Sequence, residues 1–358
     1  MENEEIKPTS TIKNIYNFII KTSSLMSIGL FATLIIGTII NQIGVLTTFT
    51  PLEEIGTVVQ AFMGIGIGLA IATYDKENSS PIRIISMGVA GGIASAINFS
   101  FDLETNPFVF TFSFTGGSKN PLLIYLVVIF AMLITRIVLK KKTPVDLIIV
   151  PLFICILASV LSVALVIPCQ YLIGGLSSVV ETATTYQPFL MGIVISVLMG
   201  MALTAPISSV AIAVAIHLSG IGAGAAAVGC SVQMIGFMMM SIKDNNIGKI
   251  ISVGIGTSML QFSNILKKPI IWLPTIIVSA ILGPISTCVL GLECNSVGAG
   301  MGTCALIGPI QVVLNTPDLL KGLLGATLLC VIVPAGMVFG LYILFLKLGW
   351  IKKGDLAI

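Results

Sequence analysis

The chain has 358 residues, of which 56% are hydrophobic and only 9% are charged, and its formal net charge is +3. Its mean hydropathy is +1.08. Soluble domains carry about 25% charged residues, so this chain has too few charges to cover a surface that faces water. The composition excludes an ordinary soluble protein. The small positive charge needs no nucleic-acid partner, because the basic residues stand in short clusters between apolar runs.

Apolar runs long enough to cross a membrane recur along the whole chain. A span needs about 20 mostly apolar residues. Runs near this length lie at 24–46, 56–73, 82–98, 121–139, 147–168, 188–204, 207–219 with 222–241, 270–290 and 322–347. We therefore predict an all-α polytopic membrane protein with about ten transmembrane helices.

The connections between these runs alternate in basic charge. Lys and Arg gather before the first run, at 76–83 and at 136–142, whereas 47–55 has none. Basic connections stay on the cytoplasmic side, so both termini are predicted to be cytoplasmic. The lysine-bearing segment 241–268 is too polar and glycine-rich to span, and we expect it to lie in the cytoplasmic interface. The predicted parts are an N-terminal tail, one membrane-embedded domain and a C-terminal tail, at 1–22, 23–347 and 348–358.

Three short segments in the C-terminal half share a pattern that interrupts helices. Each has a small residue, a proline, an isoleucine and a polar residue, at 205–208, 283–286 and 308–311. Proline removes a backbone donor, and at membrane depth the freed carbonyls must face protein or a water-filled cavity. Transporters build solute sites from such broken helices. We expect broken helices here and a re-entrant hairpin at about 292–315, with kinked but continuous helices as the alternative.

Phenylalanines also form a short pattern of their own. They stand at 108, 110, 112 and 114. Period two is typical of an extended strand with one apolar face. We interpret the stretch 99–114 as a strand that covers an outward opening, or else as an interfacial anchor.

Motifs of catalysis and metal binding are missing from the sequence. It has no phosphate-binding loop, no nucleophile-elbow motif and no zinc-protease motif, and one histidine cannot assemble a multi-histidine metal site. The seven cysteines have no C-x-x-C spacing. We therefore expect no catalytic residue, no cofactor and no bound metal ion. The chain instead suits the recognition of a small molecule by a few buried polar groups.

Ionisable residues in membrane segments are costly, which makes His217 and Glu293 the first candidates for a solute site. Polar residues in or beside the same apolar runs complete the set: Ser208, Gln233, Asn295 and Gln311. Such groups suit a neutral polyhydroxyl ligand, whose hydroxyls both donate and accept. They also suit a proton-coupled solute, because imidazole titrates near neutral pH. A histidine that only packs between helices and a carboxylate in an external loop are the structural alternatives.

The sequence resembles a known family of membrane permeases. The similarity is to the IIC permeases of the bacterial sugar phosphotransferase system, in GMALTAPISSVAIAVAI at 200–216, KDN-x-x-GK at 243–249 and GAGMGTCALIGPIQ at 298–311. Within them the chain looks most like the branch of the perfringolysin regulator, the PfoR-like proteins. The resemblance implies a homodimer in the bacterial inner membrane, with one sugar site per protomer beneath re-entrant hairpins. Related permeases hold the sugar through a glutamate and a histidine, roles that fall here to Glu293 and His217.

The resemblance leaves the mode of action open. The chain lacks the Gly-Ile-Thr-Glu motif of glucose-type permeases and has no IIA or IIB domain, so phosphotransfer needs separate IIA and IIB partners. A permease that translocates a sugar or similar polar solute by alternating access is the first interpretation. A membrane sensor of the PfoR type and a proton-coupled transporter without phosphotransfer are the alternatives.

Overall fold

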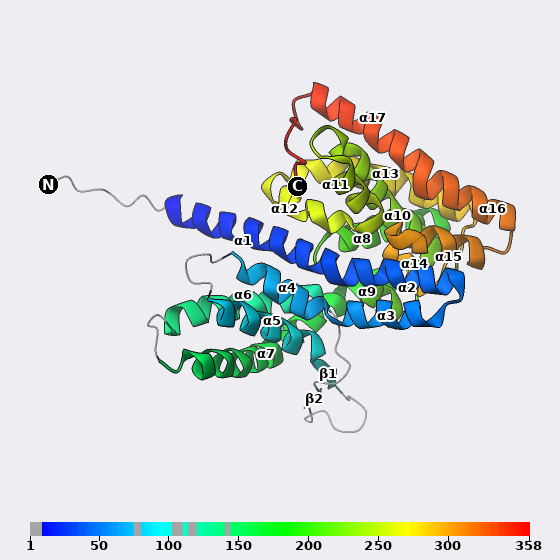
Figure 1. Ribbon diagram of the computed structural model, residues 1–358. Helices are drawn as coiled ribbons and strands as arrows, with labels where there is room; N and C mark the ends of the chain where they lie inside the picture. Colours follow the sequence, from blue (N-terminus) through cyan, green and yellow to red (C-terminus); the bar gives the residue numbers. More distant parts are fainter. Residues whose placement is uncertain (1–8, 75–79, 102–109, 114–119, 140–143) are drawn as a thin grey trace.

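The computed structural model describes residues 9–74, 80–101, 110–113, 120–139 and 144–358. Its helices form two bundles, and α1 runs alongside both (Figure 1). The first part of the chain contains α1 (Thr9–Leu30), η1 (Phe31–Ile35), α2 (Ile36–Thr47), α3 (Thr50–Ala61), α4 (Met63–Ala72), α5 (Pro81–Ala96), β1 (Asn98–Phe101), β2 (Phe110–Ser113), α6 (Pro121–Val138) and α7 (Asp146–Thr184). Here α1 packs on α4, and α5 packs on α4, α6 and α7.

The second bundle surrounds the buried helix α10. Its elements are α8 (Pro188–Thr204), α9 (Ser209–Ala215), α10 (Gly220–Met240), η2 (Ser241–Lys243), α11 (Ile247–Ile251), η3 (Ser252–Gly256), η4 (Ser258–Gln261), α12 (Phe262–Lys267), η5 (Pro269–Trp272), α13 (Leu273–Pro284), η6 (Ile285–Leu290), α14 (Ser296–Met301), η7 (Cys304–Leu306), α15 (Ile307–Asn315), α16 (Leu319–Leu324), η8 (Gly325–Ile332) and α17 (Val333–Lys347). Helices α8, α13, α14 and α17 pack around α10.

Small residues explain why α10 sits at the centre. A Cβ atom at Gly229 would overlap the backbone oxygen of Ser196 in α8, and one at Gly224 would overlap that of Leu292. Without side chains at these two positions, neighbouring backbones approach closely, which is how helices associate in an apolar solvent. The sequence of α10 therefore dictates its burial.

The architecture confirms an all-α polytopic membrane protein. Among the described residues, six helices are long and apolar enough to cross a membrane, or seven if the pair α3 and α4, bent by 43°, counts as one span. The figure of about ten spans stays a prediction, because α5, α8 and the segments 247–256 and 304–315 are shorter apolar helices. Helix α7 is also longer than the predicted run 147–168: the helix continues to Thr184, since the apolar pattern does not stop at Pro168.

The three proline segments have three different structures. At Pro206 the helix ends, because α8 stops at Thr204 and α9 starts at Ser209. At Pro284 it continues as the π-helical η6, where a wider turn accommodates the ring. Pro309 lies in the first turn of α15, a position that tolerates proline because its N–H would have no helical partner.

Two further segments differ from the sequence-based picture. The segment 241–268 is a series of short helical pieces from η2 to α12 rather than one helix, and Val253, Ser258 and Gln261 in it are buried. Its place at the membrane interface remains a prediction. At the predicted strand 99–114 the structure has two antiparallel strands, β1 and β2, in which Asn98 pairs with Ser113 and Phe101 with Phe110. Residues 102–109 and 114, including Phe108, lie outside the described residues.

Candidate functional site: a cavity where broken helices meet

A cavity of about 330 Å³ lies between the two bundles. Residues from α1, η1, α3 and α6 line one side, and residues from α8, α9, the segment 256–259 and the tip of the α14–α15 hairpin line the other. Most lining side chains are apolar, as in most small-molecule sites, and a few polar groups are available to fix orientation. The polar side chains in the lining are Gln60, Ser208, Ser209 and Thr257.

The break at Pro206 positions one wall of the cavity. Ser208 is the N-cap of α9, and its hydroxyl oxygen accepts a hydrogen bond from the backbone N–H of Ala211 at 3.2 Å. Residues 207–211 line the cavity. Ser208 is therefore the predicted site residue that the structure places in the cavity itself.

The hairpin predicted at 292–315 forms a second wall. Helices α14 and α15 are joined by a turn in which Gly302, Ala305 and Leu306 have positive φ angles of 54°, 46° and 60°. The backbone N–H of Gly308 closes the turn by donating to the oxygen of Gly302 at 2.7 Å. Met301 and Cys304, at this tip, line the cavity. The segment 296–315 thus folds as two short helices joined by a turn, and its re-entry into the membrane stays a prediction.

Helices α9 and α14 pack side by side in opposite directions. Near the cavity, Ser209 Oγ donates to the oxygen of Gly300 at 2.7 Å. At the other end, Ser296 Oγ donates to the oxygen of Leu218 at 2.9 Å. A Cβ at Gly300 would lie only 2.5 Å from the Cα of Val210, so glycine permits this contact. The pair thus connects the cavity to a second polar region about 8 Å away along α14.

This second region, the open end of the hairpin, contains three of the predicted site residues. Asn295 caps α14 by accepting from the N–H of Gly298 at 2.9 Å, and its Nδ2 donates to Oε1 of Gln311 at 2.8 Å. Glu293 bonds through its backbone to Thr316 Oγ1 at 3.1 Å. The hydrogen bonds that the structure gives Glu293 within the described residues are those of its backbone, and a role for its carboxylate stays a prediction.

His217 lies beside this open end, in the turn between α9 and α10. Its backbone has φ of 50°, and its side chain is exposed. Gly220, three residues further along the chain, accepts from the N–H of Cys294 at 3.2 Å, which brings the turn alongside the start of the hairpin. His217 is therefore near the hairpin opening, three residues after Val214, which lines the cavity, and at the opposite end of α9 from Ser208.

Gln233 is separate from both regions. It is fully buried in α10, and its Oε1 accepts from Trp272 Nε1 at 3.0 Å and from Thr275 Oγ1 at 2.9 Å. Thr204 Oγ1 donates to the same oxygen at 3.4 Å. Its carboxamide thus connects α8, α10 and α13, and it does not line the cavity.

Sequence reasoning missed Gln60 and Thr257. Gln60 lies in α3 among apolar residues, far along the chain from the proline segments, and reaches the cavity because the α2–α3 hairpin folds against the second bundle. Thr257 has extended backbone angles (φ −160°, ψ 137°) between η3 and η4. The flanking glycines Gly254 and Gly256 were the signal for this break.

In the part of the chain that the structure describes, no group of three or more His, Cys, Asp or Glu could hold a metal ion.

Comparisons with known proteins place the chain in a family. No curated protein sequence matches it. A solved structure, the transporter ChbC, the IIC component from the N,N'-diacetylchitobiose-specific phosphotransferase system, is similar with 14% identity and a TM-score of 0.41, over 97% of this chain and 96% of that one. The sequence model of the family described as "Phosphotransferase system, EIIC" matches residues 20–358. The chain therefore belongs to the EIIC family of the phosphotransferase system, whose members are its membrane-embedded sugar permeases.

Proposed function

We propose that this permease binds its sugar in the cavity between the two bundles, which we call the central cavity. The observation that supports this proposal is that three interrupted segments converge there: the α8–α9 break, the hairpin tip and the η3–η4 break. Transporters hold solutes where discontinuous helices meet, because the interrupted backbone supplies groups that a continuous helix would use itself. Ser208, Gln60 and Thr257 are the side chains that bond sugar hydroxyls.

The open end of the hairpin is the second part of the proposed path. His217, Glu293, Asn295 and Gln311 would contact a hydroxylated solute as it enters or leaves. A carboxylate and carboxamides bind hydroxyl groups without requiring a charged ligand, which fits a neutral sugar. Gln233 contributes indirectly, by holding Thr204 at the end of α8.

The proposed setting follows from the family. IIC components act with separate IIA and IIB proteins, and such partners would supply the phosphoryl group that is transferred to the sugar bound by this chain. We place it in the bacterial inner membrane as a homodimer, with 23–347 as one membrane-embedded domain and both termini in the cytoplasm. Transport itself would proceed by alternating access, with the two bundles moving around the central cavity.

Ligand-dependent thermal stabilisation of the purified protein tests this proposal. A sugar at about one hundred times its Kd stabilises by about 2.7 kcal/mol, which raises the melting temperature measurably. We expect a hit among sugars and polyols that weakens in both Ser208→Ala and His217→Ala, while the exposed control Ser178→Ala on α7 binds as the wild type does. Stabilisation by a non-sugar solute with a pH-dependent Kd would instead favour the proton-coupled transporter.

A further inference from the structure

The last residues of the chain fold back onto the segment after α10. Ile351 and Leu356 are buried, with exposed fractions of 1% and 0%. The end of the chain lies beside α11 and α12, although these two helices are far from the chain end in sequence (Figure 1). We call residues 350–358 the tail. The burial of Leu356 shows that the tail is packed into the protein.

Three carboxamide side chains bind the backbone of the tail. Asn245 Nδ2 and Gln261 Nε2 both donate to the oxygen of Leu356, at 2.7 and 2.9 Å. Asn245 Oδ1 accepts from the N–H of Ile358 at 2.8 Å, and Asn264 Nδ2 donates to the oxygen of Ala357 at 2.9 Å. These side-chain groups bond to the backbone N–H and C=O groups of the tail, so they hold the tail in one register.

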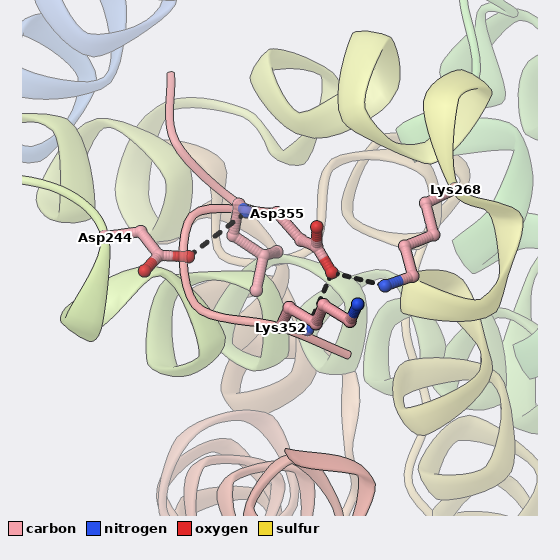
Figure 2. Close-up of polar contacts among 5 residues, drawn as sticks. Asp244, Lys268, Lys352 and Asp355 are labelled. Carbon is pink, nitrogen blue, oxygen red and sulfur yellow. Dashed lines mark hydrogen bonds and ion pairs between the residues drawn. The ribbon is translucent and has the colours of Figure 1, made fainter. Parts of the chain in front are cut away.

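Charged groups add to this attachment. Lys268 Nζ lies 2.6 Å from Asp355 Oδ2, and the same oxygen accepts from the N–H of Lys352 at 2.7 Å (Figure 2). Asp244 Oδ2 accepts from the N–H of Leu356 at 3.2 Å (Figure 2). The turn at 243–249, which the permease function does not use, thus supplies residues to the tail's binding site.

One short helix, η4, connects the tail's binding site to the central cavity. Gln261 ends η4, whose Met259 lines the cavity together with Gly256 and Thr257. Because the backbone is extended at Thr257, side-chain bonds hold this segment in place of a continuous helix. Ser258 Oγ bonds Thr204 Oγ1 at 2.8 Å. Gln261 therefore joins the tail to a wall of the cavity.

We propose that the tail is a latch on the segment 252–261, and that docking of the tail sets the position of this cavity wall. When Leu356 and Asp355 leave their sites, Gln261 loses its bond to the tail, and the wall keeps only its other bonds, such as that of Ser258 to Thr204. Release of the tail thereby changes the affinity for the solute. The last step depends on the proposed solute site, whereas the movement of 252–261 does not.

Hydrogen exchange of the whole protein without solute tests the latch directly. Leu356→Asp places a charge in a buried site, and Ala357→Asp places the same charge on the exposed neighbouring residue. We expect Leu356→Asp to accelerate exchange at least tenfold both in the tail and at the amides of 252–261, with the core of α10 unchanged. Ala357→Asp should leave both segments as in the wild type.

The outcomes separate the latch from the solute site. If the tail exchanges fast in Leu356→Asp while 252–261 keeps wild-type protection, the latch is wrong. Lys268→Gln, a milder change that keeps the core intact, must show the same pattern to a smaller degree, and unchanged exchange in both segments there also contradicts it. If 252–261 loosens but no solute affinity changes, the latch exists and the central cavity is not the solute site.

Discussion

Ser209 donates its hydroxyl hydrogen to the backbone oxygen of Gly300 at 2.7 Å, although 91 positions separate the two residues in the sequence. This bond holds the helix that begins after Pro206 against one arm of the hairpin. Both elements are too short to be stable alone, so each depends on the other for its position. The central cavity exists because these two broken segments are fixed at its edge.

Close packing of α8 and α10 gives a stability prediction. A Cβ at Gly229 would overlap the oxygen of Ser196. Gly229→Ala should therefore lower the free energy of unfolding by about 1–3 kcal/mol or more, because backbone atoms must shift. Gly336→Ala in α17 is the control: nothing lies within 4 Å of its Cβ position, and alanine favours helix. Equal melting temperatures for the two variants would contradict the packing described here.

Gln233 and Gln60 should respond in opposite ways to the same substitution. Gln233→Leu leaves Trp272 Nε1 without its acceptor, which costs about 1–3 kcal/mol if that group stays unpaired, whereas Thr275 Oγ1 keeps the backbone oxygen of Trp272 at 2.9 Å. We expect a lower melting temperature and an unchanged solute Kd. Gln60→Leu removes a polar group of the cavity, so it should weaken binding with little loss of stability. The two quantities are measured by thermal unfolding and equilibrium binding, and the reverse pattern would move the site to Gln233.

The tail should detach in acid. Burial tends to raise the pKa of Asp355, but the hydrogen bonds from Lys268 and the Lys352 N–H, with the charges of both lysines, hold it below its ordinary value of 3.8. The docked state thus favours the ionised carboxyl, so its contribution is present above that ordinary value and is lost as pH falls through the lowered pKa. Cleavage of the tail by an acid protease should rise below pH 3.8. In Lys268→Gln the tail should be cleaved more readily above that pH, with a weaker pH dependence.

Some of the fold followed directly from composition and local pattern. The all-α membrane class came from the low charge, the helix break from Pro206, and the hairpin from the glycine-rich stretch before Pro309. These features are local, because a proline or a run of small residues limits the backbone wherever it occurs. Pro284 shows the limit of this reasoning, since a π-helical turn absorbed it without ending the helix.

The site depended on contacts that no local pattern encodes. Asn295 and Gln311, both members of the predicted set of site residues, contact each other because the hairpin brings its two arms together. Ser208 and His217 belong to one predicted set of site residues, yet they stand at opposite ends of α9. Gln60 enters the cavity from the other half of the chain. The buried side chain of Gln233 accepts hydrogen bonds from its neighbours in the core, and the sequence alone does not distinguish such a residue from one that binds the solute.

Filling the central cavity tests its role most directly. Ala211 lines the cavity, whereas Ala215, one turn further along the same helix, is exposed and does not line it. Equilibrium sugar binding should be measured for Ala211→Phe and Ala215→Phe, after thermal unfolding has shown that the two variants have equal melting temperatures. We expect Ala211→Phe to weaken binding at least tenfold and Ala215→Phe to bind as the wild type does. Wild-type affinity in a folded Ala211→Phe protein would show that the sugar binds elsewhere.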